Sequence, residues 1–249
     1  MDVAAYLDRL GLDRPATADV AALRTLQDRH LAVVPFENLS MHLGEPIVLE
    51  TEALSDKIVR RRRGGFCYEL NGLFAALLRK LGFDAELRSA KVFRPDGTLG
   101  PPFDHVVVHV DLDEPWLADV GFGRFSRFPL RLSATEAQAD PEGEFLFLDA
   151  PHGDIDVLRD GDPQYRIERR PRDLDEFVPT AFWQSTSPDS PFTRGPTCSL
   201  STRHGRVTLA GDRLIVTTHG VREETTLSGD RELLDVYRKE FGIELDRTP

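Results

Sequence analysis

The sequence predicts an α+β protein built in consecutive parts, with helices first, antiparallel strands next and a smaller α/β part last. Three observations support this prediction. Apolar residues recur every three to four positions through about the first 80 residues, the period changes to two after Gly82, and a mixed pattern follows position 196. We expect parts at 1–83, 84–171, 172–196 and 197–249, the third being a helix and a connection.

Four helices are expected in the first part. The first follows 3–10 and stops at Gly11, and the second is capped by Thr17 and ends before Pro35. The third covers 54–59. The fourth, 70–81, is the clearest, because its apolar residues fall at i, i+3, i+4, i+7, i+8 and i+11 and Gly82 stands at its C-cap.

Alternating segments separated by Pro, Gly and Asp turns predict six strands in the second part, at 85–93, 105–112, 116–120, 144–149, 154–159 and 164–170. A short helix is expected at 173–182, followed by an irregular connection over 184–196. The last part contains predicted strands at 198–202, 206–209, 213–218 and 223–227. A final helix covers 230–241.

Composition excludes several classes of protein. The 249 residues include 31 Lys and Arg against 42 Asp and Glu, and the net charge of −11 argues against a general nucleic-acid binder. No apolar run approaches the roughly 18–20 residues of a membrane span, and the acidic start is unlike a signal peptide. The two cysteines provide no disulfide framework and no cysteine-based zinc site. We expect a soluble, cytoplasmic protein that needs no metal.

Cys67 is the strongest candidate for a nucleophile. Two glycines, Gly64 and Gly65, precede it, and the clearest predicted helix opens at this point. Unpaired backbone N–H groups and the positive end of the helix dipole stabilise an anion there, so we expect a lowered thiol pKa and a reactive thiolate. The alternative is a buried cysteine that acts as a small apolar residue, as we expect for Cys198.

A thiol nucleophile needs a base, and the predicted strand 105–112 contains two histidines, His105 and His109. They share one face but stand roughly 13 Å apart, so both cannot contact one sulfur. Asp119 lies in the next apolar strand, where an acidic residue is unusual unless it is paired. A hairpin turning about 113–114 pairs position 109 with about 118 and position 105 with about 122. This loosely defined turn leaves the choice of histidine open.

Other residues around these positions have structural interpretations. Arg63 in a buried loop beside Cys67 needs a carboxylate, and Glu37 is its natural partner. We interpret Arg63, Glu37 and Asn38 as a brace for the loop that carries Cys67.

Several motifs together resemble the arylamine N-acetyltransferase family. They are RGGFCYELN at 63–71, VPFENL at 34–39, WLADVGFG at 116–123, CSLST at 198–202, GRVTL at 205–209 and FGI at 241–243. The resemblance covers nearly the whole chain, and it implies a catalytic triad of Cys67, His105 and Asp119. It therefore favours His105 over His109 as the base. It also implies an N-terminal helical bundle, a central antiparallel β-barrel and a C-terminal α/β lid joined by an interdomain helix.

The resemblance further implies acetyl-CoA-dependent N-acetylation of arylamines or arylhydrazines by ping-pong transfer through a Cys67 thioester, without a metal. Pro101-Pro102-Phe103 stand where members often have a Thr-Gly-like pair that helps to hold the cofactor. Aromatic residues and glycines expected to line the acceptor or cofactor pocket are Phe36, Phe66, Phe93, Phe103, Gly121, Phe122, Gly123 and Trp183. Cations of the lid expected to offset the charge of coenzyme A are Arg203, His204 and Arg206.

Three alternatives stay open at this point. One is an amide synthase of the same family that closes a macrocycle on its own Cys-bound substrate. Another is a transglutaminase-like cysteine hydrolase, which has the same order of Cys, His and Asp. The last is a binding module that keeps the fold without catalysis.

Overall fold

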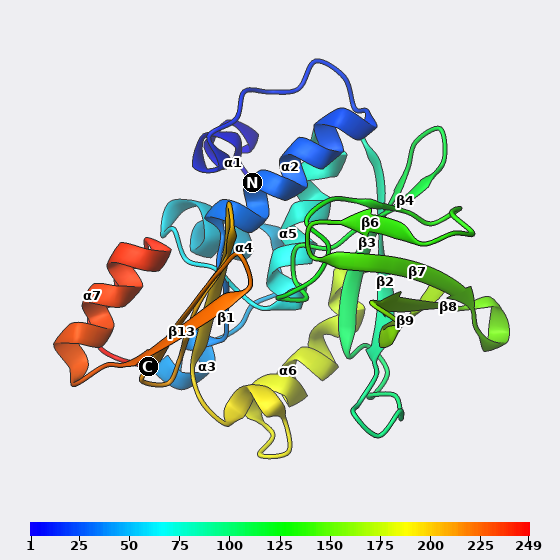
Figure 1. The fold of residues 1–249 in the computed structure, drawn as a ribbon. Helices are drawn as coiled ribbons and strands as arrows, with labels where there is room; N and C mark the ends of the chain where they lie inside the picture. The colour runs from blue at the N-terminus through cyan, green and yellow to red at the C-terminus, as the bar shows by residue number, and fades with distance from the viewer.

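Two antiparallel sheets, one of eight strands and one of five, organise the chain in a computed structural model that describes all 249 residues. The central helix α5 (Cys67–Lys80) lies between the two sheets in the view of Figure 1. Its buried face includes Leu70, Leu73 and Phe74, as the helical period predicts. The α+β class and the order of helices, barrel and α/β lid are confirmed.

Helices make up most of the first 80 residues. They are α1 (Val3–Leu10), α2 (Val20–Val33), α3 (Leu39–Leu43), α4 (Thr51–Ser55), which continues as one wider turn over Asp56–Arg60, and α5. Asp19, and not the expected Thr17, caps α2, because its carboxylate accepts the N–H of Ala22 at 2.9 Å. The Thr17 hydroxyl instead donates to Asp19 at 2.5 Å. No helix is long and apolar enough to cross a lipid bilayer.

The larger sheet curls into a nearly closed barrel with strand order β5-β4-β3-β2-β9-β8-β7-β6. The Gln138 side chain bridges its two edges, since it accepts the N–H of Arg131 at 2.8 Å and donates to the Arg131 carbonyl at 3.0 Å. The strands are β2 (Asp84–Val92), β3 (His105–Asp111), β4 (Pro115–Ala118), β5 (Leu130–Arg131), β6 (Gln138–Asp140), β7 (Gly143–Asp149), β8 (Ile155–Arg159) and β9 (Asp162–Arg172).

The β3–β4 hairpin fixes where Asp119 lies. His109 pairs with Leu117, one position away from the expected partner, and Val108 pairs with Ala118. Pairing ends there, so Asp119 is the first residue beyond the ladder. Its side chain is therefore free to turn toward the start of β3, where His105 lies.

The lid sheet has the order β1-β10-β11-β12-β13, and α7 (Asp230–Phe241) packs against it. Its strands are β1 (Phe36–Glu37), β10 (Thr197–Thr202), β11 (Gly205–Ala210), β12 (Arg213–Thr218) and β13 (Val221–Thr226). The edge strand β1 was not expected, and it ties the N-terminal region to the lid through the pairs Phe36–Ser199 and Glu37–Cys198.

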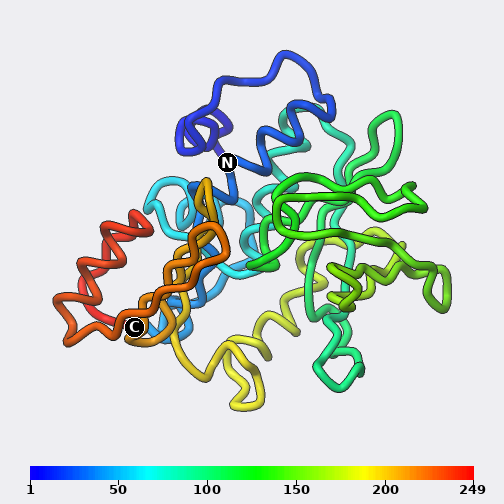
Figure 2. The backbone as a smooth tube through the Cα atoms, viewed as in Figure 1, coloured from blue at the N-terminus to red at the C-terminus, as the bar shows by residue number.

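The connection between barrel and lid contains a longer helix than expected. After the turn Leu174–Phe177, α6 covers Val178–Thr186, so three residues assigned to the irregular connection are helical. A short turn at Pro191–Thr193 follows. The tube in Figure 2 shows this segment (yellow) running below α5 from the barrel to the lid sheet.

Candidate active site

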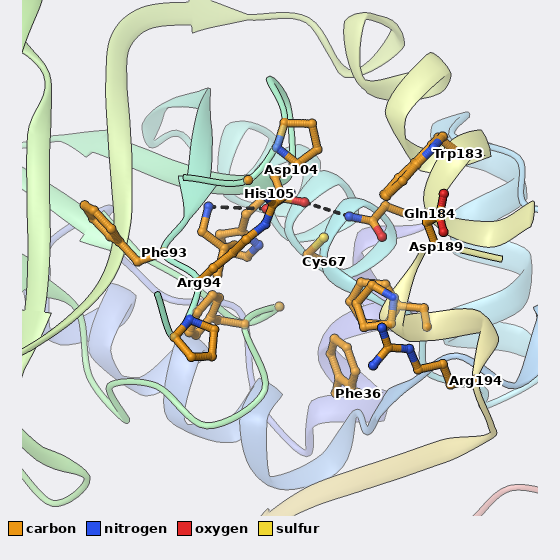
Figure 3. A pocket seen from close by; sticks show the side chains of 18 residues that line it. Phe36, Cys67, Phe93, Arg94, Asp104, His105, Trp183, Gln184, Asp189 and Arg194 are labelled. Atoms are coloured by element: carbon orange, nitrogen blue, oxygen red, sulfur yellow. Dashed lines mark hydrogen bonds between the residues drawn. The ribbon is translucent and has the colours of Figure 1, made fainter. Parts of the chain in front are cut away.

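Cys67 is the first residue of α5, and only 4% of it is exposed. Its neighbour Phe66 precedes the helix, and the Glu69 carboxylate accepts the Phe66 N–H at 3.2 Å. Glu69 also binds Lys57 at 2.8 Å, so its charge is directed into a buried ion pair. Cys67 lines a pocket of about 580 Å³, toward which its sulfur is directed (Figure 3).

The thiol of Cys67 does not have the lowered pKa that its helix position suggests. Burial raises the pKa well above the usual value, and the carboxylates of Asp119 and Asp104 raise it further. Backbone N–H groups of Tyr68 and Val106 act in the opposite direction but do not outweigh burial. The free site therefore holds a thiol, and forming the thiolate requires a base.

His105 lines the same pocket from the first residue of β3. Its Nε2 lies 2.7 Å from Oδ2 of Asp119, and both side chains are almost fully buried. A carboxylate can only accept, so Nε2 carries the hydrogen and Nδ1 is left as the basic nitrogen of the neutral ring. The structure thus pairs Asp119 with His105.

Asp119 is held by three further donors, two of which the sequence analysis missed. Oδ1 accepts from Asn71 Nδ2 at 2.8 Å and from the N–H of Gly121 at 2.9 Å, and Oδ2 accepts from the Tyr165 hydroxyl at 3.1 Å. Asn71 also accepts the N–H of Val120 at 2.9 Å. Asn71 lies within the recognised motif at 63–71, whereas nothing in the local sequence marks Tyr165 of β9.

His109 occupies the same face of β3 at its other end. It lies opposite Glu86 of β2, with Nδ1 4.0 Å from Oε2 of Glu86 and without a hydrogen bond. Burial lowers its pKa. It is not among the residues that line the pocket.

Aromatic side chains form much of the pocket wall. Of the expected residues, five line it: Phe36, Phe93, Gly121, Phe122 and Trp183. Phe192, which was not singled out from the sequence, lines it as well. A Cβ on Gly121 would lie 2.7 Å from Cα of Cys67, so this glycine is required by the close approach of α5, and the freed space is not available to a ligand.

Three residues expected in the pocket lie outside its lining. Phe66 is fully buried and packs edge-on against Tyr68, with ring centroids 4.9 Å apart. Phe103 instead packs edge-on against Phe177 at 5.2 Å. The carbonyl of Gly123 accepts a hydrogen bond from Arg206 at 2.9 Å, which directs this residue toward the lid.

The three lid cations expected to face coenzyme A are also outside the pocket. Arg203 and His204 are exposed in the turn between β10 and β11. The Arg206 guanidinium donates hydrogen bonds to the Gly123 carbonyl, to the Ser199 hydroxyl at 3.0 Å and to the Ser201 hydroxyl at 2.9 Å. Burial lowers the pKa of Arg206. The cations that do line the pocket are Arg94 and Arg194, and neither forms an ion pair.

A buried ionic network supports the loop before Cys67. Nε of Arg63 donates to Glu37 at 3.0 Å, and Nη1 donates to Glu45 at 3.1 Å. Burial raises the pKa of Glu37, but Lys57 and Arg63 outweigh it and leave the carboxyl pKa below its usual range. Asn38 accepts the N–H of Thr197 at 2.6 Å and donates to two carbonyls of the connection.

Comparison with known proteins identifies relatives of the whole chain. A sequence model of a family described as N-acetyltransferase matches residues 19–249. The arylamine N-acetyltransferase of Mycolicibacterium smegmatis is 35% identical over 98% of this chain and 93% of its own length. That of Escherichia coli K12 is 32% identical over 97% of this chain and 88% of its own length.

Solved structures give the same result. The M. smegmatis arylamine N-acetyltransferase superimposes with a TM-score of 0.90 at 34% identity, covering 98% of this chain and 93% of that one. The Mycobacterium marinum enzyme, solved in complex with CoA, has a TM-score of 0.88 at 30% identity, covering 97% and 93%. The fold and site are therefore those of an acetyltransferase. The chain belongs to the arylamine N-acetyltransferase family.

Proposed function

We propose that this enzyme transfers an acetyl group from acetyl-CoA to the amino group of arylamines and arylhydrazines by a ping-pong reaction through a thioester on Cys67. One observation carries the proposal: a cysteine at a helix N-terminus and an imidazole fixed by a carboxylate face one pocket. The M. marinum relative was solved with CoA, which supports a CoA thioester as the donor.

The geometry of the site supports a role for each of the three residues. Nδ1 of His105 accepts the Cys67 proton, and Asp119 holds the ring and stabilises the imidazolium. The sulfur attacks the donor carbonyl, the bond from the acyl carbon to the CoA sulfur breaks, and His105 returns the proton to the departing thiolate. One thioester replaces another, so the acetyl-enzyme persists until an acceptor arrives. The acceptor nitrogen then attacks the acetyl carbon and the bond from that carbon to the Cys67 sulfur breaks. His105 passes the nitrogen proton to the Cys67 thiolate.

The Cys67 thiolate and the His105 imidazolium would form an ion pair only during the reaction. The raised pKa of Cys67 keeps the free thiol protonated, so its reactivity depends on His105. Weakly basic arylamines are unprotonated near neutral pH and can attack directly. The aromatic wall formed by Phe93, Phe122 and Trp183 would contact the ring of such an acceptor in offset or edge-on geometry.

Anionic groups of coenzyme A would be held at the pocket by Arg94 and Arg194. Arg94 belongs to the loop after β2 and Arg194 to the connection after α6. Since neither has a carboxylate partner, both guanidinium groups are available to phosphate oxygens. Arg63, Glu37 and Asn38 would act as the brace that keeps the Cys67 loop and the connection in place.

Intact-mass spectrometry after mixing with acetyl-CoA and no acceptor tests the proposal. We expect one acetyl adduct, mapped to the peptide containing Cys67, and stoichiometric release of free CoA. The Cys67→Ser variant should stay folded and should not turn over. Labelling by a glutamine peptide instead of acetyl-CoA would indicate a transglutaminase-like enzyme, and an unlabelled wild-type protein would contradict the proposal.

A further inference from the structure

Four carboxylates belong to the site or to the ionic network beside it, and one of them forms no ion pair. Glu37 binds Arg63 at 3.0 Å, Glu69 binds Lys57 at 2.8 Å and Asp119 binds His105 at 2.7 Å. Asp104 differs from these three, because its hydrogen-bond donors are neutral groups. A partly desolvated carboxylate that forms no ion pair is unusual and identifies a place where a cation would be stabilised.

The Asp104 side chain is fixed in a defined orientation. Oδ1 accepts from Gln184 Nε2 at 2.6 Å, and Oδ2 accepts a longer bond from the Val92 N–H at 3.3 Å. A Cβ on Gly100 would lie 2.0 Å from Oδ2, so the glycine makes room for the carboxylate. Gln184 is buried and is held in turn by the Ser190 hydroxyl at 2.7 Å. Three segments of the chain therefore hold this carboxylate at the pocket.

Asp104 lies close to the reacting groups. It immediately precedes His105, it lines the same pocket as Cys67, and its charge raises the pKa of the Cys67 thiol. Figure 3 shows the Asp104 carboxylate bonded to Gln184, on the side of the pocket where the Cys67 sulfur lies. A group bonded to Asp104 would thus be near the acyl group carried by the sulfur.

The surroundings of Asp104 favour a cation as its missing partner. Burial raises its pKa, and the opposing effects of the Val92 N–H, His105, Gln184 and Arg94 do not cancel this. The positive charge of an acceptor would compensate the desolvated carboxylate. Aromatic faces in the pocket wall attract cations as well.

We propose that Asp104 is the binding site for a protonated acceptor nitrogen, so that the acceptors of this enzyme include arylalkylamines that are ammonium ions in solution. The inference rests on the proposed acetyl transfer through Cys67.

Transfer to a bound ammonium ion moves two protons. The bound ammonium gives one proton to Asp104, which passes it to solvent, and the freed nitrogen lone pair attacks the thioester carbonyl. A C–N bond forms, the bond between the acyl carbon and the Cys67 sulfur breaks, and the second nitrogen proton passes through His105 to the thiolate. The products are a neutral amide and the free Cys67 thiol.

A matched pair of acceptors tests this proposal with acetyl-CoA as donor. At pH 7.5, 4-methoxyaniline is neutral and 4-methoxybenzylamine is protonated, while their rings are the same. We expect the wild-type enzyme to acetylate both. Asp104→Asn keeps the shape and an acceptor for Gln184 but removes the charge. Its kcat/KM should fall about 20-fold or more for the benzylamine and stay within about threefold for the aniline.

Asp111→Asn is the control, because Asp111 is an exposed carboxylate at the end of β3 outside the pocket, and neither acceptor should be affected. Three results would overturn the proposal. An equal loss of kcat/KM for both acceptors in Asp104→Asn would mean that Asp104 only braces α6, and an unchanged kcat/KM would mean that Asp104 has no role. A wild-type enzyme that does not acetylate the benzylamine would also contradict it. Absence of any acetyl adduct on Cys67 would instead refute the proposed function.

Competition between ligands on the wild-type enzyme tests the same site without the Asp104→Asn variant. The dead-end compound 4-methoxy-N,N-dimethylbenzylamine is cationic at this pH and cannot form a stable amide, whereas 4-methoxytoluene is neutral and of similar shape. We expect the cation to compete with 4-methoxyaniline about tenfold more tightly than the neutral compound. Equal or weaker competition by the cation would contradict the proposal.

Discussion

Asp119 contacts only one of the two candidate histidines. Four donors from different segments hold its carboxylate, so it cannot move to follow a more distant ring. The bond to Nε2 of His105 therefore orients that imidazole and leaves Nδ1 as the basic nitrogen of the neutral ring. His109, four residues along β3, has neither this partner nor access to the pocket.

This difference predicts a ranking of two substitutions. His105→Ala removes the base and leaves a thiol whose pKa burial has raised, so we expect acetyl-enzyme formation to fall by at least about 1000-fold. His109→Ala should reduce the rate by less than about fivefold. Single-turnover release of CoA, followed for both variants, measures the step. The opposite order would show that the base had been assigned to the wrong residue.

Helix packing makes the N-terminal part sensitive to acid. His30 of α2 is fully buried, with Nε2 2.9 Å from the Tyr6 hydroxyl of α1 and its ring 5.3 Å from that of Phe74 in α5. Burial, together with Arg9, lowers its pKa from 6.5 to about 3. The folded protein therefore keeps this ring neutral at pH values where the unfolded chain protonates it.

The consequence is a loss of stability as pH falls below about 6.5, continuing to about pH 3. By proton linkage, the free energy of unfolding falls by about 2 kcal/mol between pH 7 and pH 5 because of His30 alone. His30→Gln retains a polar partner for Tyr6 and does not titrate, so the drop in unfolding free energy over that interval should be about 2 kcal/mol smaller than in wild type. Urea unfolding at both pH values measures it. An identical drop in the two proteins would mean that His30 is not held neutral.

The loop before α5 depends on a buried ion pair. Arg63 and Glu37 are both almost inaccessible, and Arg63 also reaches Glu45. Arg63→Met leaves Glu37 with only Lys57, at 4.0 Å, as a cationic neighbour, so we expect a loss of about 3–5 kcal/mol in unfolding free energy. Adding Glu37→Gln to this variant removes the unpaired charge and should restore part of the loss. A single variant as stable as wild type would contradict a bracing role.

Elements set by local signals were predictable from the sequence, and those set by distant partners were not. The 3.6-residue period and Gly82 predicted α5 to within three residues at its start and one at its end, and alternation predicted most of the barrel strands. By contrast, β1 is two residues long and exists only because β10, about 160 positions later, pairs with it. The hairpin count missed the β3–β4 register by one position, so spacing alone could not choose between His105 and His109.

The same distinction holds within the site. A recognisable motif surrounds Cys67 and another surrounds Asp119. Cys67 lines the pocket, and Asp119 binds His105, which lines it as well. Tyr165 and Asp104 lie outside those motifs, and their roles depend on contacts with residues 46 and 80 positions away. The lowered pKa expected for Cys67 was wrong because helix position is a local property, whereas burial of the thiol and the charges of Asp104 and Asp119 depend on distant parts of the chain.

The charge of the whole molecule opposes binding of its proposed donor. A net charge of −11 repels polyanionic coenzyme A at long range, and Arg94 and Arg194 are the unpaired cations on the pocket lining. Added salt weakens both the repulsion and the local attraction. The local attraction should dominate in wild type, because the two arginines would contact the phosphates directly. Its kcat/KM for acetyl-CoA should therefore fall as NaCl rises from about 20 to 200 mM.

The double variant Arg94→Gln, Arg194→Gln should reverse this salt dependence. Only the repulsion then remains, so kcat/KM for acetyl-CoA should rise with NaCl, and KM for acetyl-CoA at low salt should increase at least about tenfold. KM for an uncharged arylamine should not change. Arg203→Gln is the matched control, since Arg203 is an exposed arginine of the lid outside the pocket. If Arg203→Gln raised KM for acetyl-CoA and the double variant did not, the phosphates would bind at the lid turn instead.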